Sequence, residues 1–365
     1  AQIRALRELL EESVDGVITP LPDDAPDAAQ WRDWDRGHYG KPWSVAPFLW
    51  AESYFFRRIL QATGYFAAGS DGADDSAGDS TAERTDAASS SWAGVDPYEP
   101  MKSAELADPQ LEAGFAWYAG LAELAPDRRF AALVEAAVLG NRADLVFKVT
   151  EVVDGYTSVN PPLADDTTLI HRRLTGHGAP VAFLCDNAGR ELISDLLLAD
   201  ELLATNAAAS VELHVKPVPY YISDATAADV GKCLRRLRSM PGALGEAGRR
   251  LYERAAAGRL RTLTHPFWTS PLDLRELPAG LRTSLAGRFL VVKGDLNYRR
   301  LVGDRRWDPA TPFADAAGYL GLPLAALRAA KSDVVVGLGR EQAQRLDAAE
   351  PDWRLNGRHS LIQTA

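Results

Sequence analysis

Short runs with a β-strand pattern alternate with helical patterns in the second half of the chain, and this alternation constrains the fold more than any other feature. Three of these runs each lead into a helical pattern: 180–186 before 190–204, 210–224 before 226–238, and 288–295 before a pattern that starts at 296. A fourth run, 332–338, follows a helical pattern at 323–331. Buried parallel strands are near-continuous apolar runs, joined by helices. The sequence therefore predicts an α/β fold with a mainly parallel sheet.

The first half of the chain is dominated by helical patterns, which cover residues 3–13, 44–66, 108–125 and 128–145. Within it, residues 67–94 consist largely of Ala, Gly, Ser and Asp and contain almost nothing to bury, so they are predicted to be a disordered acidic insertion. Because 365 residues exceed what one hydrophobic core usually serves, we predict two domains. These are a mainly helical N-terminal domain over residues 1–165 and an α/β domain over residues 166–365.

Composition narrows the classes of partner. A net charge of -10 disfavours nucleic acid and anionic membranes unless a local basic patch exists, and no long run of Lys and Arg occurs. No stretch approaches the ~18 apolar residues that a membrane span needs. The two cysteines, Cys185 and Cys233, are too few for a disulfide framework and fit a reducing compartment. We expect a cytoplasmic protein with a small-molecule partner, and the oligomeric state is left open.

Acidic side chains follow three of the predicted strands. Asp186 with Asn187, Asp224 and Asp295 stand where the strands end, which is the edge of a parallel sheet at which ligands bind. Carboxylates and amides offer hard oxygen ligands, which suit magnesium or manganese together with substrate phosphate. Alternatively, Asp186 and Asn187 only form an Asx turn and a helix cap.

Three cations are candidates for binding that phosphate. Lys293 ends a strand that should be buried, and burying an ammonium costs several kcal/mol unless an anion receives it, for which a phosphate is suited. The alternative is that Lys293 already lies in solvent. Arg328 and Lys331 are one helical turn apart in the predicted helix, so both can point the same way and clamp a phosphate. The alternative for this pair is an exposed helical face.

Five strings give the chain a family resemblance: "DNAGRELISDLLLADELL", "VKPVPYYISDAT", "HPFWTSP", "KGDLNYRRLVGDRRW" and "LRAAKSDVVVGL". In this order and spacing they resemble the metal-dependent damage-control phosphatase family, also called domain of unknown function 89, in its acidic residue methyltransferase-like branch. The resemblance implies a helical N-terminal domain before a Rossmann-like α/β/α sandwich. It also implies hydrolysis of phosphate monoesters of small metabolites, chiefly sugar phosphates, with Mn²⁺ or Mg²⁺, or alternatively Co²⁺ or Ni²⁺.

The resemblance also implies roles for individual residues. The DNxG motif falls on Asp186 and Asn187, which would bind the metal with Asp224 as third ligand and form the catalytic set. The substrate-binding residues would be the GDxNY segment and the Arg-Thr-x-Lys motif, namely Asp295, Leu296, Asn297, Tyr298, Arg328 and Lys331. The chain departs from the second motif at Ala329, which replaces a hydroxyl-bearing residue, and this bears on substrate preference.

Two other functions are compatible with the predicted fold. The first is methyl transfer from S-adenosylmethionine to protein carboxylates, but the first strand is followed by Asp-Asn instead of the glycine-rich loop that such enzymes carry. The second is a non-catalytic binding module, against which the intact Asp186, Asn187, Asp224 and Lys331 argue. The sequence leaves open whether Asp186 holds a cation or attacks the phosphoryl group.

Overall fold

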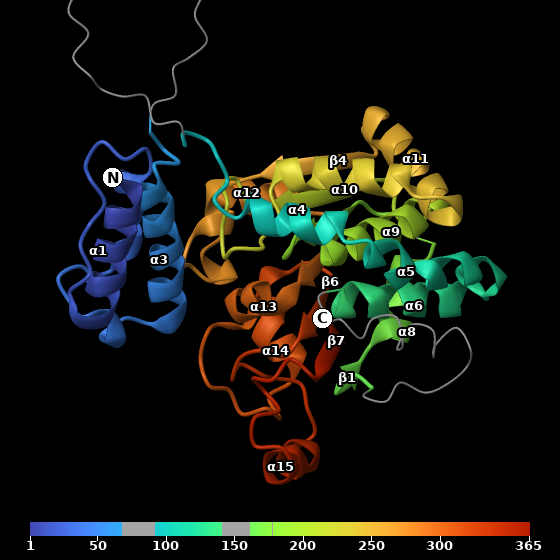
Figure 1. Cartoon of the computed structure of the whole chain (residues 1–365). Coiled ribbons are helices and arrows are strands. Elements are labelled where there is room, and N and C mark those ends of the chain that lie inside the picture. Colours follow the sequence, from blue (N-terminus) through green and yellow to red (C-terminus); the bar gives the residue numbers. More distant parts are fainter. Residues whose placement is uncertain (68–91, 141–160, 177) are drawn as a thin grey trace, which may run out of the picture. The chain divides into compact units, whose positions relative to one another are not determined.

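The structure is a computed structural model that describes residues 1–67, 92–140, 161–176 and 178–365 (Figure 1). Its contacts divide it into two compact units, one of Ala1–Pro100 with Val218–Ile222 and one of Met101–Pro217 with Ser223–Ala365. The domain boundary predicted at residue 165 lies within the second unit. The insertion predicted at 67–94 lies almost entirely outside the described residues.

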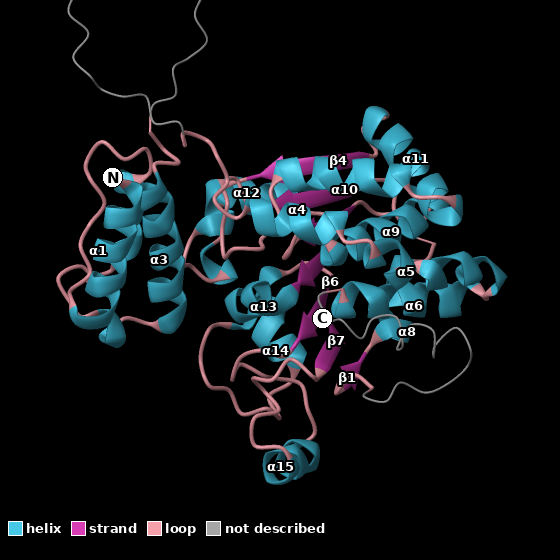
Figure 2. Cartoon of the chain, in the orientation of Figure 1, coloured by secondary structure: helices cyan, strands magenta, loops and turns pink. Residues whose placement is uncertain are grey.

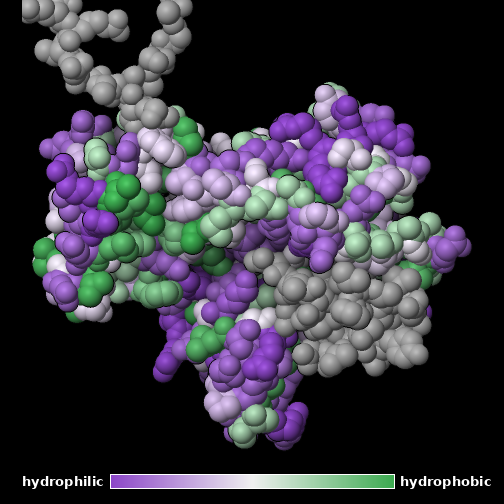
Figure 3. Space-filling view, in the orientation of Figure 1, coloured by the Kyte–Doolittle hydropathy of each residue, from purple (hydrophilic) through white to green (hydrophobic). Residues whose placement is uncertain are grey.

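The first unit is helical and has an aromatic core. It contains α1 (Gln2–Asp15), α2 (Ala28–Asp35), the short η1 (Trp43–Val45) and α3 (Phe48–Thr63). Trp31, Trp43, Trp50 and Tyr54 are buried together, and the Trp31 and Tyr54 ring centroids are 4.9 Å apart. Apolar residues also gather on the visible face of α1 and α3 (Figure 3). Even so, no helix among the described residues combines the length and the apolarity that crossing a bilayer requires.

The second unit is built on a seven-stranded sheet in the order β1-β7-β6-β5-β2-β3-β4. All neighbouring strands in it are parallel except β6 and β7, so the predicted mainly parallel α/β fold is confirmed. The strands are β1 (Ala164–Asp165), β2 (Val181–Leu184), β3 (Val211–Val215), β4 (Leu260–Thr264), β5 (Phe289–Lys293), β6 (Leu324–Ala329) and β7 (Ser360–Thr364).

Helices cover both faces of this sheet (Figure 2). Alternate strand residues enter different cores: Phe183 and Val291 pack into one, and Leu184 and Val292 into the other. The first core contains α6 (Pro126–Leu139), α8 (Thr167–Leu174), α9 (Arg190–Ala204), α10 (Ala227–Ser239) and α11 (Gly242–Ala256). The second contains α12 (Ala279–Leu285), α13 (Gly294–Val302) and α14 (Phe313–Ala317), with η3 (Pro266–Thr269), η4 (Leu274–Glu276) and η5 (Gly318–Leu320). The result is the predicted three-layer α/β/α arrangement.

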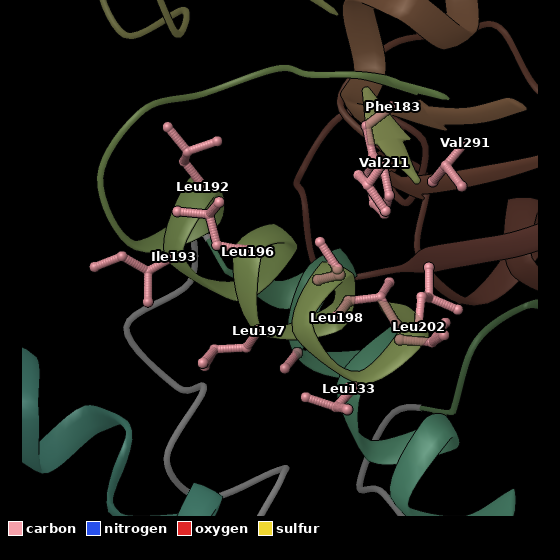
Figure 4. Packing of buried hydrophobic residues seen from close by; sticks show 14 of the residues in the cluster. Leu133, Phe183, Leu192, Ile193, Leu196, Leu197, Leu198, Leu202, Val211 and Val291 are labelled. Atoms are coloured by element: carbon pink, nitrogen blue, oxygen red, sulfur yellow. The ribbon is translucent and has the colours of Figure 1, made fainter. Parts of the chain in front are cut away.

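Helix α9 is central to the first core. Its leucines pack with Leu133 of α6 and with Phe183, Val211 and Val291 of the strands (Figure 4). This explains why the string after Asp186 is so rich in leucine, since α9 is buried on nearly all sides. The remaining elements are α4 (Glu99–Ala107), α5 (Gln110–Gly114), η2 (Ala116–Glu123) and α15 (Arg340–Ala349).

Two neighbouring predicted elements are wrong. Residues 323–331 were expected to be helical and 332–338 to be a strand, but 324–329 form β6 and 332–338 form no regular element. Leucine and alanine favour a helix locally, yet here they lie between β5 and β7 and are buried on both faces. Packing in the sheet therefore overrides the local preference, and Arg328 and Lys331 do not share a helical turn.

Candidate active site

The sheet has a topological switch point between β2 and β5. From β2 the chain continues to β3 and β4 on one side, and it then returns to β5 and β6 on the other side. Leu184 of β2 pairs with Val292 of β5, so the carboxyl ends of these two strands are level. Ligands of open α/β sheets bind at such a point. Asp186 and Asp295 follow these two strand ends directly.

Backbone hydrogen bonds bring the predicted ligand residues together. Asn187 and Asp224 form an antiparallel bridge. On either side of it, the Ala188 N–H donates to the Ser223 carbonyl at 2.7 Å and the Ala225 N–H donates to the Asp186 carbonyl at 2.8 Å. The loop after β2 and the loop after β3 are thus joined at the positions that carry Asp186, Asn187 and Asp224. We call these two segments, 186–189 and 223–226, the ligand loops.

The side chain of Asn187 is held at both ends. Its Nδ2 donates to Asp186 Oδ2 at 3.0 Å and to Glu191 Oε2 at 2.8 Å, while its Oδ1 accepts from the Ser223 hydroxyl at 2.5 Å. Glu191 is buried in the first turn of α9. Glu191 was not predicted from the sequence, although its place in the first turn of the helix that follows Asn187 was the available signal. Asp224 has its own buried cation, since Lys216 Nζ lies 3.1 Å from Asp224 Oδ2.

The site contains more negative than positive charge. Eight buried side chains interact here, five carboxylates and three ammonium groups, which are Asp186, Glu191, Asp195, Asp224, Asp229, Lys102, Lys216 and Lys293. Burial raises the pKa of Asp186 well above its usual range, and repulsion from Glu191 and Asp224 adds to the effect. Burial also raises the pKa of Asp224, against the opposing attraction of Lys216. With all eight groups ionised, two negative charges are in excess.

Lys293 has partners other than the expected phosphate. Its ammonium lies 3.0 Å from Asp195 and 3.2 Å from Glu191, and it donates a hydrogen bond to the Ala137 carbonyl of α6. Burial alone would lower the pKa of Lys293, but the two carboxylates raise it. The side chain is therefore neither in solvent nor available to a substrate. Its visible role is to neutralise Glu191, which in turn holds Asn187.

The buried Arg328 pairs with the partly buried Asp295 beside the switch point. Arg328 is fully buried and donates to Asp295 Oδ1 at 2.7 Å, to the Val334 carbonyl and to Ser332. Asp295 Oδ1 also accepts from the Lys331 backbone N–H at 3.0 Å. The Arg328 guanidinium thus fixes the turn after β6 from the inside. Lys331 is exposed, and no described residue donates to, accepts from or pairs with its ammonium.

The remaining residues of the predicted substrate segment are buried. Leu296 is buried, and Asn297 Nδ2 donates to the carbonyls of Leu184, Cys185 and Lys293 at 3.3, 3.2 and 2.9 Å. The Tyr298 hydroxyl donates to Gln363 Oε1 at 2.9 Å. Asn297 and Tyr298 thus support the end of β2 and the strands nearby, and in this structure none of the three side chains is open to a substrate.

Gly294 brings the β5 exit into contact with Asp186. Its φ is +80°, and a Cβ at this position would lie 1.9 Å from Asp186 Oδ2. Only glycine combines this backbone conformation with so close an approach. The Asp186 carboxylate therefore packs on the first residue of α13, and a chain of contacts runs from Asp186 through Gly294 and Asp295 to Lys331.

The donor set suits a hard divalent cation. The described residues contain no group of three or more His, Cys, Asp or Glu side chains placed to hold a metal ion. Protein ligands would therefore have to be the two carboxylates of Asp186 and Asp224 with the Asn187 amide, completed by water or substrate oxygens as is usual for Mg²⁺. The excess of two negative charges is what a divalent cation would neutralise.

Sequence comparisons with known proteins indicate one family. The sequence profile of the damage-control phosphatase ARMT1-like domain matches residues 5–346. Damage-control phosphatase ARMT1 of Danio rerio is 27% identical over 97% of this chain and 82% of its own length. The Bos taurus protein of that name is 28% identical over 97% of this chain and 84% of its own length. A crystal structure of a DUF89 family protein from Pyrococcus horikoshii superposes with a TM-score of 0.48 at 12% identity, covering 95% of this chain and 92% of that chain.

Proposed function

The chain belongs to the damage-control phosphatase ARMT1-like family, and from that premise we propose that it hydrolyses phosphate monoesters of small metabolites, chiefly sugar phosphates, with the help of a divalent metal ion. One observation carries the proposal. Asp186, Asn187 and Asp224 meet at the switch point of the sheet, in a buried cluster whose five carboxylates outnumber its three ammonium groups.

Asp186, Asn187 and Asp224 are the residues that would hold the metal, with Mn²⁺ or Mg²⁺ best suited and Co²⁺ or Ni²⁺ as alternatives. Bound there, a divalent cation supplies Lewis-acid stabilisation of the charge on a phosphoryl group. Glu191 and Ser223 fix the Asn187 amide from opposite ends, so that the amide oxygen keeps one orientation. Such fixed dipoles and charges need no reorganisation during reaction, which is the main advantage of an enzyme site over water.

Lys331 is the cation that we assign to the phosphate. Lys293 and Arg328 are fully buried and already paired with carboxylates, whereas Lys331 is exposed at the carboxyl end of β6. Its backbone N–H is tied to Asp295, so the base of the side chain is fixed while the ammonium can move. An ammonium in this position neutralises charge on the transferring group without itself exchanging a proton.

The test is phosphate release from a panel of sugar phosphates and para-nitrophenyl phosphate. Each divalent metal is added in turn, with a chelator control, to the wild type and to Asp186→Ala and Asp224→Ala. We expect release that requires metal and is lost in both variants. Asp200→Asn is the matched control, because Asp200 is a buried aspartate of α9 whose partners, Arg250 and Arg254, lie outside the ligand loops.

Full activity in Asp186→Ala would refute the site. No release with any metal, together with measurable S-adenosylmethionine binding, would refute the phosphatase proposal and favour methyl transfer. Loss of activity in Asp200→Asn equal to that in Asp186→Ala would show that the assay reports folding instead of the site.

A further inference from the structure

Helix α4 presents two side chains of opposite charge on one face, and each reaches a different ligand loop. Lys102 and Glu105 are three residues apart, so they are neighbours on the helix surface. Lys102 contacts the loop that carries Asp224, and Glu105 contacts the loop that carries Asp186 and Asn187. No sequence motif described above includes either residue.

Lys102 binds the backbone of the Asp224 loop. Its ammonium donates to the Asp224 carbonyl oxygen at 3.0 Å and to Asp229 Oδ2 at 2.9 Å. The side chain is only 4% exposed, so its charge is desolvated and the contacts are strong. Asp229 also accepts from the Thr226 N–H and hydroxyl, which completes the cap of α10. Lys102 thus fixes both the carbonyl of Asp224 and the helix start that follows.

Glu105 binds the backbone of the other loop. Its Oε1 accepts from the Arg190 N–H at 3.1 Å, and its carboxylate packs on Gly189, where a Cβ would come within 2.1 Å of Oε2. Gly189 has φ of +68° and ψ of -133°, a conformation that is essentially restricted to glycine. The carboxylate also faces the N-terminus of α9, where negative charge is favoured. Glu105 therefore fixes the turn that directly follows Asn187.

We propose that α4 is a clasp: Lys102 and Glu105 are positioning residues that hold the two ligand loops at the spacing needed for metal binding. The inference rests on the proposed function, since it assigns the loops to a metal. The two loops are joined by the backbone bridge between Asn187 and Asp224, and across this bridge Asp186 and Asp224 repel each other. A helix that bonds to both loop backbones opposes this repulsion without using any ligand side chain.

The experiment measures the dissociation constant of Mn²⁺, from the electron paramagnetic resonance signal of free Mn²⁺, on the full-length chain without substrate. The variants are Lys102→Met, Glu105→Ala and the double variant, with Glu105→Gln as a conservative replacement that keeps an acceptor for the Arg190 N–H. Met101→Ala controls for changes in α4, since Met101 is 66% exposed. Arg129→Met controls for general destabilisation, since it breaks the ion pair to Glu201 at 2.7 Å without touching the ligand loops.

Each single variant is expected to weaken Mn²⁺ binding about 10- to 100-fold, the range found when groups that orient metal ligands are removed. The double variant should bind about as weakly as the worse single variant, because a helix that bonds to only one loop no longer fixes the spacing between the two. Glu105→Gln should lose less than Glu105→Ala, and neither control should change the constant.

Two outcomes would overturn the clasp. One is Mn²⁺ binding by the single variants at wild-type strength, and the other is a double variant whose loss is the product of the two single losses, which would mean two independent local effects. A wild type that binds no Mn²⁺ and releases no phosphate would instead refute the proposed function, so the two failures are distinguishable.

Discussion

Replacing Lys293 by methionine separates a structural role for this lysine from the phosphate-binding role that its position in the sequence suggested. Methionine keeps most of the side-chain stem and removes the ammonium. Asp195, at 3.0 Å, and Glu191, at 3.2 Å, would then be buried without their shared cation. Breaking a buried pair by removing one partner costs about 3–5 kcal/mol. Because a domain typically has about 5–15 kcal/mol of stability, Lys293→Met should lose a large fraction of it.

The assay is urea unfolding at pH 7, followed by far-ultraviolet circular dichroism. The matched variant is Lys293→Met combined with Asp195→Leu, which replaces the pair by apolar groups and leaves Glu191 in contact with Asn187. Apolar replacement of a buried pair is often close to neutral, so the double variant should regain at least half of the loss. A loss of less than about 1 kcal/mol in the free energy of unfolding of Lys293→Met, together with a raised KM, would refute this reasoning and indicate that Lys293 binds the substrate.

Three further predictions address the glycine, histidine and arginine that surround the site. Gly294→Ala should displace Asp186 and thereby weaken Mn²⁺ binding and lower kcat, each by more than about tenfold. Gly287 also has a positive φ, of +74°, but has open space for a Cβ, so Gly287→Ala should only lower the free energy of unfolding by about 1–3 kcal/mol. Equal kcat values in the two variants would contradict this prediction. Burial lowers the pKa of His214 from 6.5 to about 4, so the folded state binds fewer protons than the unfolded state in that window. The stability that this group contributes is present above pH 6.5 and lost as pH falls toward 4. Between these pH values the free energy of unfolding should therefore fall by up to about 3 kcal/mol less in His214→Gln than in the wild type, as measured by unfolding curves. Arg328→Lys should lower the melting temperature with little change in KM, because lysine cannot reproduce the planar fork that bonds Asp295; an unchanged melting temperature and a higher KM would assign Arg328 to the substrate.

The strands that sequence reasoning found and missed differ in burial and composition. Strands β2 and β5 were predicted because each is buried on both faces and largely apolar, and β3 was predicted from its Val and Leu residues although it also carries Glu212 and His214. Strand β4 was missed because it lies at the sheet edge, where Arg261 and Thr262 are exposed and break the apolar run. Strand β6 was misread as a helix because Leu and Ala carry a helical preference that only the neighbouring strands override.

The candidate site was predictable where it follows strand exits and not where it depends on distant contacts. Asp186 and Asn187 follow the end of β2, so their place at the sheet edge could be inferred from the rule for parallel sheets. Asp224 was predicted to end a run over 210–224, but β3 ends at Val215, and the bridge to Asn187 is what brings Asp224 to the site. Lys102 lies 122 residues from Asp224 in the chain, and Glu105 lies 85 residues from Arg190. Nothing in the local pattern of α4 indicates which backbone groups its side chains reach, because such contacts are set by tertiary packing.

The pairing of β1 with β7 has a consequence for the order in which the sheet forms. Strand β1 has two residues, Ala164 and Asp165, and the N–H groups of Leu163 and Asp166 beside it donate to the β7 backbone at 2.8 and 2.9 Å. Because so short a strand must offset the closure of a long loop, we expect this pairing to form last and to open first. In deuterated water, the amides of Leu163 and Asp166 should exchange well before those of β2 and β5. A probe of partial unfolding should accordingly detect this edge of the sheet first, while β2 and β5 are still paired at the switch point.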